Sequence, residues 1–179
     1  MWNIIGRSLA SRPLPVAAPP LEETHLAELG KRLDEAARAR LGRSLAIREV
    51  DAGSCNACEL EIQALNNAFY DLERFGLRFV ASPRHADVLL VTGPVTTNMR
   101  EALERTHRAM PDPKWVVAVG DCARNGGLFA GSYAVAGGVS RVLPVDLHIP
   151  GCPPTPAQLL SGLLALLEAA GAGKVPSAP

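Results

Sequence analysis

Four cysteines are the residues of this 179-residue chain best suited to chemistry. Cys55 and Cys58 are separated by only two residues, whereas Cys122 and Cys152 follow at much longer intervals. In a reducing cytosol, four thiols favour a metal ion or an iron–sulfur cluster over disulfide bonds. The simplest alternative is four small buried side chains, and the positions of the cysteines in the fold distinguish these possibilities.

The segments around the cysteines alternate between predicted strands and predicted helices. We expect strands over residues 44–50, 78–81, 87–93, 115–120 and 141–149, and helices over residues 21–41, 59–75, 98–110 and 156–170. Continuous apolar runs such as Val88–Val91 are typical of parallel strands that are covered on both faces. The sequence therefore predicts an α/β fold, a flavodoxin-like, doubly wound parallel sheet with strand order 2-1-3-4-5.

This topology places every cysteine at the same edge of the sheet. Cys55 and Cys58 follow the first predicted strand, Cys122 follows the fourth, and Cys152 follows the fifth. Ligands of open parallel sheets bind outside the carboxyl ends of the strands. Thiols that are far apart in the sequence are therefore expected to converge on one site.

Glycine and proline residues mark the same loops. Gly53 precedes the first pair of cysteines, Gly120 precedes Cys122, and Gly151 and Pro153 flank Cys152. Glycine lets backbone amides approach a ligand closely. Amide donors near cluster sulfurs tune the reduction potential, so this loop composition suits a redox cluster.

Three kinds of four-cysteine site remain open from the spacing alone. Structural zinc sites usually combine two closely spaced pairs, and only one pair is close here. A [4Fe-4S] cluster accepts ligands from separate loops, so the spacing favours it. A C-x-x-C redox dithiol would leave Cys122 and Cys152 unexplained. The sequence has neither a G-x-x-x-x-G-K-[ST] loop nor a strand-linked G-x-G-x-x-G, so nucleotide binding is not supported.

The composition excludes several classes of protein. The 18 Lys and Arg residues balance the 18 Asp and Glu residues, which argues against a broad nucleic-acid-binding surface. The longest near-apolar stretch, Leu159–Leu167, is too short to cross a bilayer. Residues 1–7 lack the apolar region of a signal peptide. We therefore expect a cytosolic, globular chain.

We expect three segments along the chain. Residues 1–43 form an N-terminal arm and helix, because four prolines within residues 1–20 interrupt any continuous helix before the predicted one. Residues 44–170 form the α/β domain that carries the cysteines, and residues 171–179 form a flexible tail.

Four motifs, taken together, resemble the 20-kDa subunit family of respiratory complex I. They lie at residues 53–62 (GSCNACELEI), 82–93 (SPRHADVLLVTG), 120–122 (GDC) and 149–156 (IPGCPPTP). They occur in the family's order, and the resemblance covers roughly residues 45–170. That family includes the small subunits of the related membrane-bound [NiFe]-hydrogenases.

The first motif separates the branches of that family. The NADH–quinone reductase branch carries adjacent cysteines there, whereas the hydrogenase branch carries C-x-x-C, as at Cys55 and Cys58. The chain is therefore more similar to the small subunits of membrane-bound energy-converting hydrogenases of the formate hydrogenlyase type.

The resemblance implies an electron-transfer subunit of an oxidoreductase complex with no independent catalysis. Cys55, Cys58, Cys122 and Cys152 would be the ligands of one [4Fe-4S] cluster, which would relay electrons between a ferredoxin-like subunit and a [NiFe] large subunit. The implied location is peripheral, beside membrane subunits on the cytoplasmic side of the cell membrane. The alternatives are the equivalent subunit of an NADH– or ferredoxin–quinone oxidoreductase, and a zinc-stabilised interaction module.

Five further polar side chains are candidates for roles near the cysteines. Glu59 is either a proton relay beside the cluster or an acidic residue that suits the start of a helix. His148 either couples protonation to reduction or has a structural role. Arg84 and His85 either contact a partner or lie on the surface. Arg124, in a predicted loop, could offset the charge of the cluster.

Overall fold

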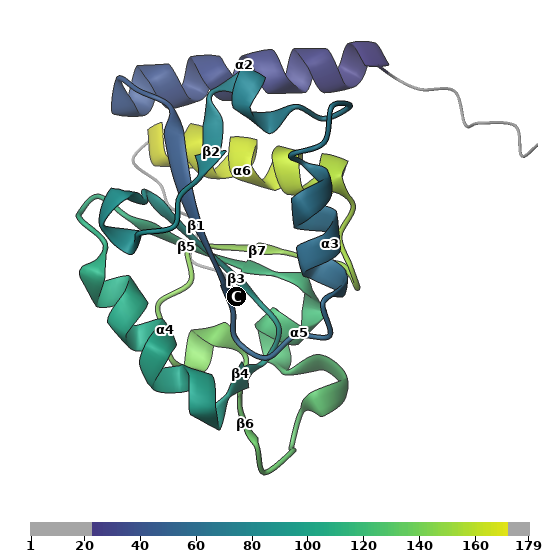
Figure 1. The fold of residues 1–179 in the computed structure, drawn as a ribbon, viewed down its shortest axis with the longest axis vertical. Coiled ribbons are helices and arrows are strands. Elements are labelled where there is room, and N and C mark those ends of the chain that lie inside the picture. Colours follow the sequence, from purple (N-terminus) through teal and green to yellow (C-terminus); the bar gives the residue numbers. More distant parts are fainter. Residues whose placement is uncertain (1–22, 172–179) are drawn as a thin grey trace, which may run out of the picture.

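A five-stranded parallel sheet forms the centre of the fold (Figure 1). The computed structural model describes residues 23–171. The strands of this sheet are β1 (Leu45–Asp51), β2 (Leu77–Phe79), β3 (Val88–Thr92), β5 (Trp115–Val119) and β7 (Leu147–Ile149). Their spatial order, β2-β1-β3-β5-β7, confirms the predicted doubly wound topology.

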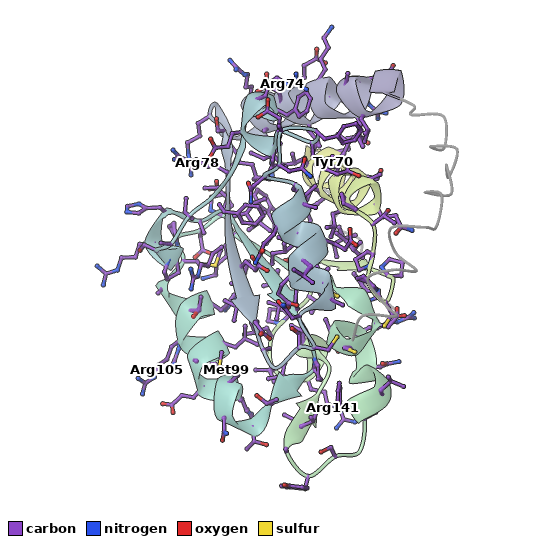
Figure 2. All side chains as sticks on the ribbon, turned by 45° about the vertical axis from the view of Figure 1, so that its right-hand side comes forward. Tyr70, Arg74, Arg78, Met99, Arg105 and Arg141 are labelled. Carbon is purple, nitrogen blue, oxygen red and sulfur yellow. The ribbon has the colours of Figure 1, made fainter. Side chains whose placement is uncertain are left out.

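Helices cover both faces of the sheet, as continuous apolar strands require. They are α2 (Glu23–Leu41), α3 (Ala57–Ala64), α4 (Thr97–Ala109), α5 (Gly120–Asn125) and α6 (Pro156–Gly171). Helices α2, α3 and α6 pack on one face, and α4 and α5 pack on the other (Figure 1). Figure 2 shows the two layers from another side, with Tyr70 in the first layer and Met99 in the second.

Short elements complete the chain between these helices and strands. They are the 3₁₀ turns η1 (Leu72–Phe75), η2 (Pro83–His85), η3 (Gly127–Phe129) and η4 (Val139–Arg141), and the strands β4 (Val95–Thr96) and β6 (Val135–Gly137). Strands β4 and β6 form a separate antiparallel pair. The sequence does not predict this pair, because two or three residues are too few for a periodic pattern.

The alternation of side chains along β1 decides which layer each residue faces. Leu45 and Ile47 are buried in the core that includes Ile62 of α3. Val50, of the opposite parity, is buried in the core that includes Leu103 of α4. Since side chains alternate along a strand, Glu49 shares the face of Ile47 and lies on the side of α3.

Helix α3 is shorter than the helix predicted over residues 59–75. It ends at Ala64, because the side chain of Asn67 accepts hydrogen bonds from the backbone N–H groups of Phe69 and Tyr70, both at 2.9 Å. An Asn side chain that binds the backbone in this way favours a turn over a helix. The chain then resumes helical geometry only in η1.

The last strand is also shorter than the prediction over residues 141–149. Pro144 interrupts the segment and has no N–H to donate to a neighbouring strand. Pairing with β5 begins where Asp146 N donates to Val116 O at 2.9 Å, and Val116 N donates back to Asp146 Oδ2 at 2.7 Å. Strand β7 therefore consists of only the three residues before Pro150.

Helix α2 packs on α6 across the first layer. Leu33 is fully buried in the same core as the sheet, and Arg32 bonds Glu168 of α6 at 2.6 Å. The predicted arm before Glu23 and most of the predicted tail lie outside the described residues. Among the helices of residues 23–171, none is long and apolar enough to cross a membrane.

A buried carboxylate joins the amino ends of β1 and β3. Asp87 is 3% exposed and accepts two hydrogen bonds from Arg43, at 2.6 and 3.0 Å. Its Oδ2 also accepts the backbone N–H of Ala46 at 2.9 Å. The Asp87 carboxylate therefore accepts hydrogen bonds both from the backbone of β1 and from the guanidinium of Arg43.

Replacing Asp87 with alanine should lower the free energy of unfolding by about 1–3 kcal/mol, because the Ala46 N–H and the Arg43 guanidinium lose their partner. Urea denaturation measures this loss. The matched control is Glu101→Ala, which removes an exposed carboxylate that pairs with Arg105 and should change stability by about 0.5 kcal/mol or less. Equal losses in the two variants would contradict the role given to Asp87.

Candidate functional site

The four cysteines lie at the carboxyl ends of three strands, as the topology predicts. Cys55 is in the loop after β1, and Cys58 is in the first turn of α3. Cys122 is in α5, which follows β5 directly, and Cys152 is in the loop between β7 and α6. Cys55 and Cys152 are exposed, whereas Cys58 and Cys122 are partly buried.

The electrostatics of the thiols indicate that they form one group. The pKa of Cys58 is raised to about 12, first by burial and then by the nearby Glu59, Cys55, Cys122 and Cys152. Burial also raises the pKa of Cys122, with Cys152 and Cys55 adding to the effect. Each partly buried thiol is therefore close enough to the others for their charges to interact.

Two glycines let the backbone come close to the partly buried thiols. A Cβ atom on Gly120 would lie 2.8 Å from Cys58 Sγ and 3.3 Å from the Gly151 carbonyl oxygen. A Cβ atom on Gly127 would lie 2.5 Å from Cys122 Sγ. Real Cβ atoms do not approach sulfur so closely, so both positions require glycine for the thiols to keep these places.

Hydrogen bonds fix the Cys122 and Cys152 segments against each other. Asp121 N donates to the Gly151 carbonyl at 2.9 Å, and Gly151 N donates to Asp121 Oδ1 at 3.2 Å. The Nε2 atom of His148 bonds the Gly120 carbonyl at 3.1 Å. Since a carbonyl can only accept, this bond requires the proton on Nε2 and gives His148 a structural contact.

The Cys55 loop is held by its own turn. Asp51 Oδ1 accepts the backbone N–H groups of Gly53 and Ser54, both at 2.7 Å, and Ser54 Oγ accepts that of Asn56 at 3.1 Å. These bonds shape the backbone just before Cys55. Asp51 and Asp121 are positioning residues that sequence reasoning missed, although the Asp-x-Gly pattern at residues 51–53 is a turn signal.

The thiols are not arranged around a single metal ion in the described residues. Within residues 23–171, no group of three or more His, Cys, Asp or Glu side chains is arranged to hold one ion. The donor set consists of four thiols from separate loops, and the backbone N–H of Leu128 donates to the sulfur of Cys122. Four thiol donors with an amide donor beside them fit the surroundings of an iron–sulfur cluster.

Glu59 lies directly beside the thiols and is 7% exposed. Neither of its carboxylate oxygens has a hydrogen-bond partner. A buried carboxylate without a hydrogen-bond partner carries a desolvation cost that a favourable charge at the start of α3 does not by itself explain.

The other predicted candidates lie further from the thiols or on the surface. Arg84 and His85 are exposed in η2, which precedes β3, so they lie at the amino edge of the sheet, opposite the cysteines. Arg124 is exposed and lies in α5, not in a loop as predicted. Helix α5 begins where Gly120, with a φ of 83°, turns the chain out of β5.

Comparison with known families decides what kind of chain carries this site. The family described as NADH ubiquinone oxidoreductase, 20 Kd subunit, matches residues 55–166, a span that contains all four cysteines. The chain belongs to this family. The resemblance inferred from the four sequence motifs is thereby confirmed, and the protein is a subunit of an oxidoreductase.

Two relatives of this 20-kDa-family chain are subunits of larger enzymes. It is 41% identical over 187 residues to formate hydrogenlyase subunit 7 of Escherichia coli (strain K12). This alignment covers 100% of this chain and 70% of the relative. It is 46% identical over 128 residues to a probable membrane-bound hydrogenase subunit of Pyrococcus furiosus, over 72% of this chain and 77% of the relative.

A solved structure shares the fold of this family member. A chain of the membrane-bound sulfane sulfur reductase, an archaeal respiratory membrane complex, superposes with a TM-score of 0.66 at 36% identity, over 80% of this chain and 77% of that one. The 20-kDa-family chain is therefore a small subunit of the hydrogenase and complex I type.

The contact between Gly120 and Cys58 can be tested with a matched pair of variants. Gly120 and Gly131 have φ angles of 83° and 82°, but a Cβ on Gly131 would meet nothing within 4 Å. Both alanine variants carry the backbone strain of a positive φ, about 1–2 kcal/mol. Only Gly120→Ala should lose a further 1–3 kcal/mol, roughly, from overpacking against Cys58 Sγ.

Urea denaturation of the reduced, metal-free chain measures both losses. Equal destabilisation by Gly120→Ala and Gly131→Ala would mean that the sulfur contact does not constrain Gly120.

Proposed function

We propose that this chain binds one [4Fe-4S] cluster through Cys55, Cys58, Cys122 and Cys152 and relays electrons within a membrane-associated hydrogenase complex. The observation that carries the proposal is the convergence of four thiols from three loops at one sheet edge. The C-x-x-C spacing of the first pair, together with the two hydrogenase relatives, supports the hydrogenase assignment.

The chemistry of the donor set supports a cluster. Because burial and the neighbouring acidic and thiol groups raise the pKa of Cys58 to about 12, its thiolate needs a compensating positive charge, and iron would supply one. When bound, a [4Fe-4S] cluster accepts and returns single electrons at a potential set by its surroundings. The chain's part is to hold the ligands, exclude water from Cys58 and donate the Leu128 N–H to Cys122.

The surface beside the cysteines supports a large-subunit partner there. Cys55 and Cys152 are exposed, and Leu128 and Tyr133 in the segment after Cys122 are 93% and 100% exposed. Exposed apolar side chains grouped at a functional edge are typical of a protein–protein interface. We place the [NiFe] large subunit on this edge.

The remaining partners follow from the same proposal. A ferredoxin-like subunit supplies the electrons, and membrane subunits anchor the complex, with this chain peripheral on the cytoplasmic side. Glu59, buried beside Cys58 without a hydrogen-bond partner, is the candidate for a proton relay toward the large subunit.

A second candidate is an equivalent subunit whose large subunit passes electrons to quinone or another acceptor. This second candidate is supported by the structural likeness to a sulfane sulfur reductase chain and by the complex I members of the family. The adjoining large-subunit sequence discriminates between them. Two C-x-x-C pairs for nickel and iron mean a hydrogenase, and their loss means another acceptor.

The cluster itself is tested on anaerobically purified protein. We expect iron and acid-labile sulfide in a ratio typical of a cubane, and an EPR signal after reduction. Stoichiometric zinc without iron would instead support the zinc-stabilised interaction module and would exclude the electron relay.

Replacing Cys152 with serine should lower the cluster content several-fold and abolish electron transfer, while leaving the sheet folded, because Cys152 lies in an exposed loop. Iron analysis, EPR and circular dichroism measure the three effects. The control is Ser161→Ala, an exposed position on α6 outside the cysteine loops. Full cluster content in Cys152→Ser would argue against ligation by Cys152.

A further inference from the structure

Exposed basic side chains gather at the amino edge of the sheet, at the opposite ends of the strands from the cysteines. They are Arg78 in β2, Arg84 and His85 in η2, and Arg108 in the last turn of α4. Arg78 lies near the start of β2, η2 leads into β3, and α4 leads into β5, so these elements meet at the edge where the strands begin. We call these four residues the amino-edge patch.

Backbone pairing places the elements of this patch side by side. Arg78 is paired with Ala46 of β1, and the Ala46 carbonyl accepts the N–H of Asp87, just after η2, at 2.8 Å. The turn η2 contacts α4, and Ala86 shares a core with Met110, which follows α4 directly. The three elements therefore form one continuous surface.

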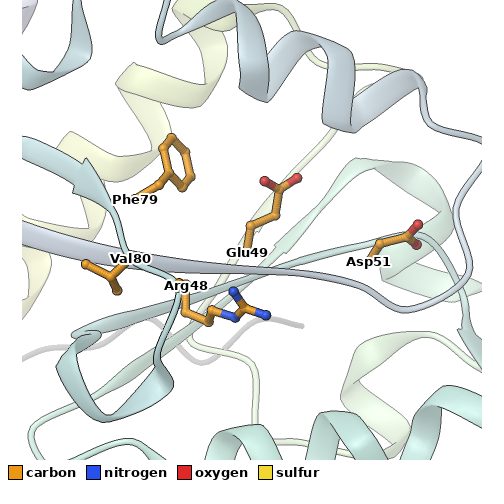
Figure 3. A pocket seen from close by; sticks show the side chains of 6 residues that line it. Arg48, Glu49, Asp51, Phe79 and Val80 are labelled. Atoms are coloured by element: carbon orange, nitrogen blue, oxygen red, sulfur yellow. The ribbon is translucent and has the colours of Figure 1, made fainter.

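The side chain of Arg78 lies on the same side of the sheet as α4. The next residue, Phe79, packs with the core of α2, α3 and α6, and side chains alternate along a strand. Figure 3 shows this alternation around a cavity of about 330 Å³ at the end of β2, where Phe79 and Glu49 point to one side of β1 and Arg48 to the other. In Figure 2, Arg78 and Arg105 of α4 lie along the same side of the molecule.

The arginines of the amino-edge patch have no carboxylate of their own. Within residues 23–171, Arg78, Arg84 and Arg108 take part in no ion pair. Carboxylates of the same region pair with other cations; these pairs are Asp87 with Arg43, Glu101 with Arg105, and Glu104 with Arg100. The patch is therefore positive although the whole chain has a formal charge of zero.

The chemistry of the patch fits phosphate groups better than it fits a protein surface. Guanidinium groups present planar, forked donors that match phosphate oxygens. Protein interfaces have an apolar core inside a polar rim, whereas a layer of anionic headgroups requires only positive charge. None of the large apolar side chains that are exposed in the described residues lies in β2, η2 or α4; they are Leu60, Phe69, Leu128, Phe129 and Tyr133.

We propose that the amino-edge patch binds the phosphate groups of anionic phospholipids at the membrane surface. The choice of a membrane rests on the proposed function, which makes this chain a peripheral part of a membrane-associated complex. Because the patch and the cysteines lie at opposite ends of the strands, lipid and the large subunit can be contacted at the same time. Contacts of this kind are individually weak, so they orient the chain while the membrane subunits anchor the complex.

The experiment measures sedimentation of the full-length chain with vesicles of phosphatidylcholine, either alone or mixed with phosphatidylglycerol. We expect binding to the mixed vesicles at about 0.1 M salt and its loss at about 1 M salt, because the screening length falls from about 10 to about 3 Å. Vesicles of phosphatidylcholine alone report any binding through exposed apolar side chains, and they should retain little protein at either salt concentration.

The combined replacements Arg78→Gln, Arg84→Gln and Arg108→Gln should weaken binding to the mixed vesicles roughly a hundredfold, since each arginine near an anionic surface contributes about a fivefold factor. Replacing the same three arginines with lysine should keep most of the binding, because the charge remains. Circular dichroism establishes that both triple variants are folded.

A matched pair of single variants tests whether position matters as well as charge. Arg84→Gln should lose about a fivefold factor in binding. Arg141→Gln removes the same charge from η4, which is exposed and lies away from the patch in Figure 2, and should bind like the wild type.

The possible results separate this inference from the proposed function. Equal binding by the wild type and the triple glutamine variant, or equal binding to the two kinds of vesicle, overturns the lipid site alone. A triple variant that still binds the mixed vesicles but no longer copurifies with the other subunits assigns the patch to an acidic protein surface and also overturns it. A chain that binds the mixed vesicles but contains no iron or sulfide supports the patch and overturns the electron relay.

Discussion

The desolvation of the cysteine thiols is the constraint on which the rest of this site depends. A thiol with a pKa near that of Cys58, about 12, becomes a metal ligand only if positive charge replaces the lost hydration. The backbone must then surround the sulfurs closely enough to exclude water. That requirement explains the glycines at positions 120 and 127, where any side chain would reach the sulfur of Cys58 or Cys122.

The two edges of the parallel sheet carry different groups of interactions. Its carboxyl edge carries the thiol loops, which the reciprocal bonds between Asp121 and Gly151 join directly. Its amino edge carries the Asp87 carboxylate, which accepts hydrogen bonds from the backbone of β1 and from Arg43. Because the two groups of bonds lie at opposite ends of the strands, the cysteine loops can be shaped for a ligand without weakening the core.

The fold and the cysteine site were predictable from sequence because each depends on a rule that acts over long runs of residues. Apolar strands such as Val88–Thr92 identify the sheet, and the strand-end rule then places all four thiols. The end of α3 was not predictable from periodicity, since a single side chain, Asn67, decides it. The burial of Glu49 was not predictable either, because its environment exists only once α3 lies over β1.

The buried carboxyl groups follow from the same desolvation that governs the thiols. Burial and the charge of Glu59 raise the pKa of Glu49, as they also raise the pKa of Cys58. Low dielectric strengthens the repulsion between these charges, and proton uptake by a carboxylate is the way to relieve it.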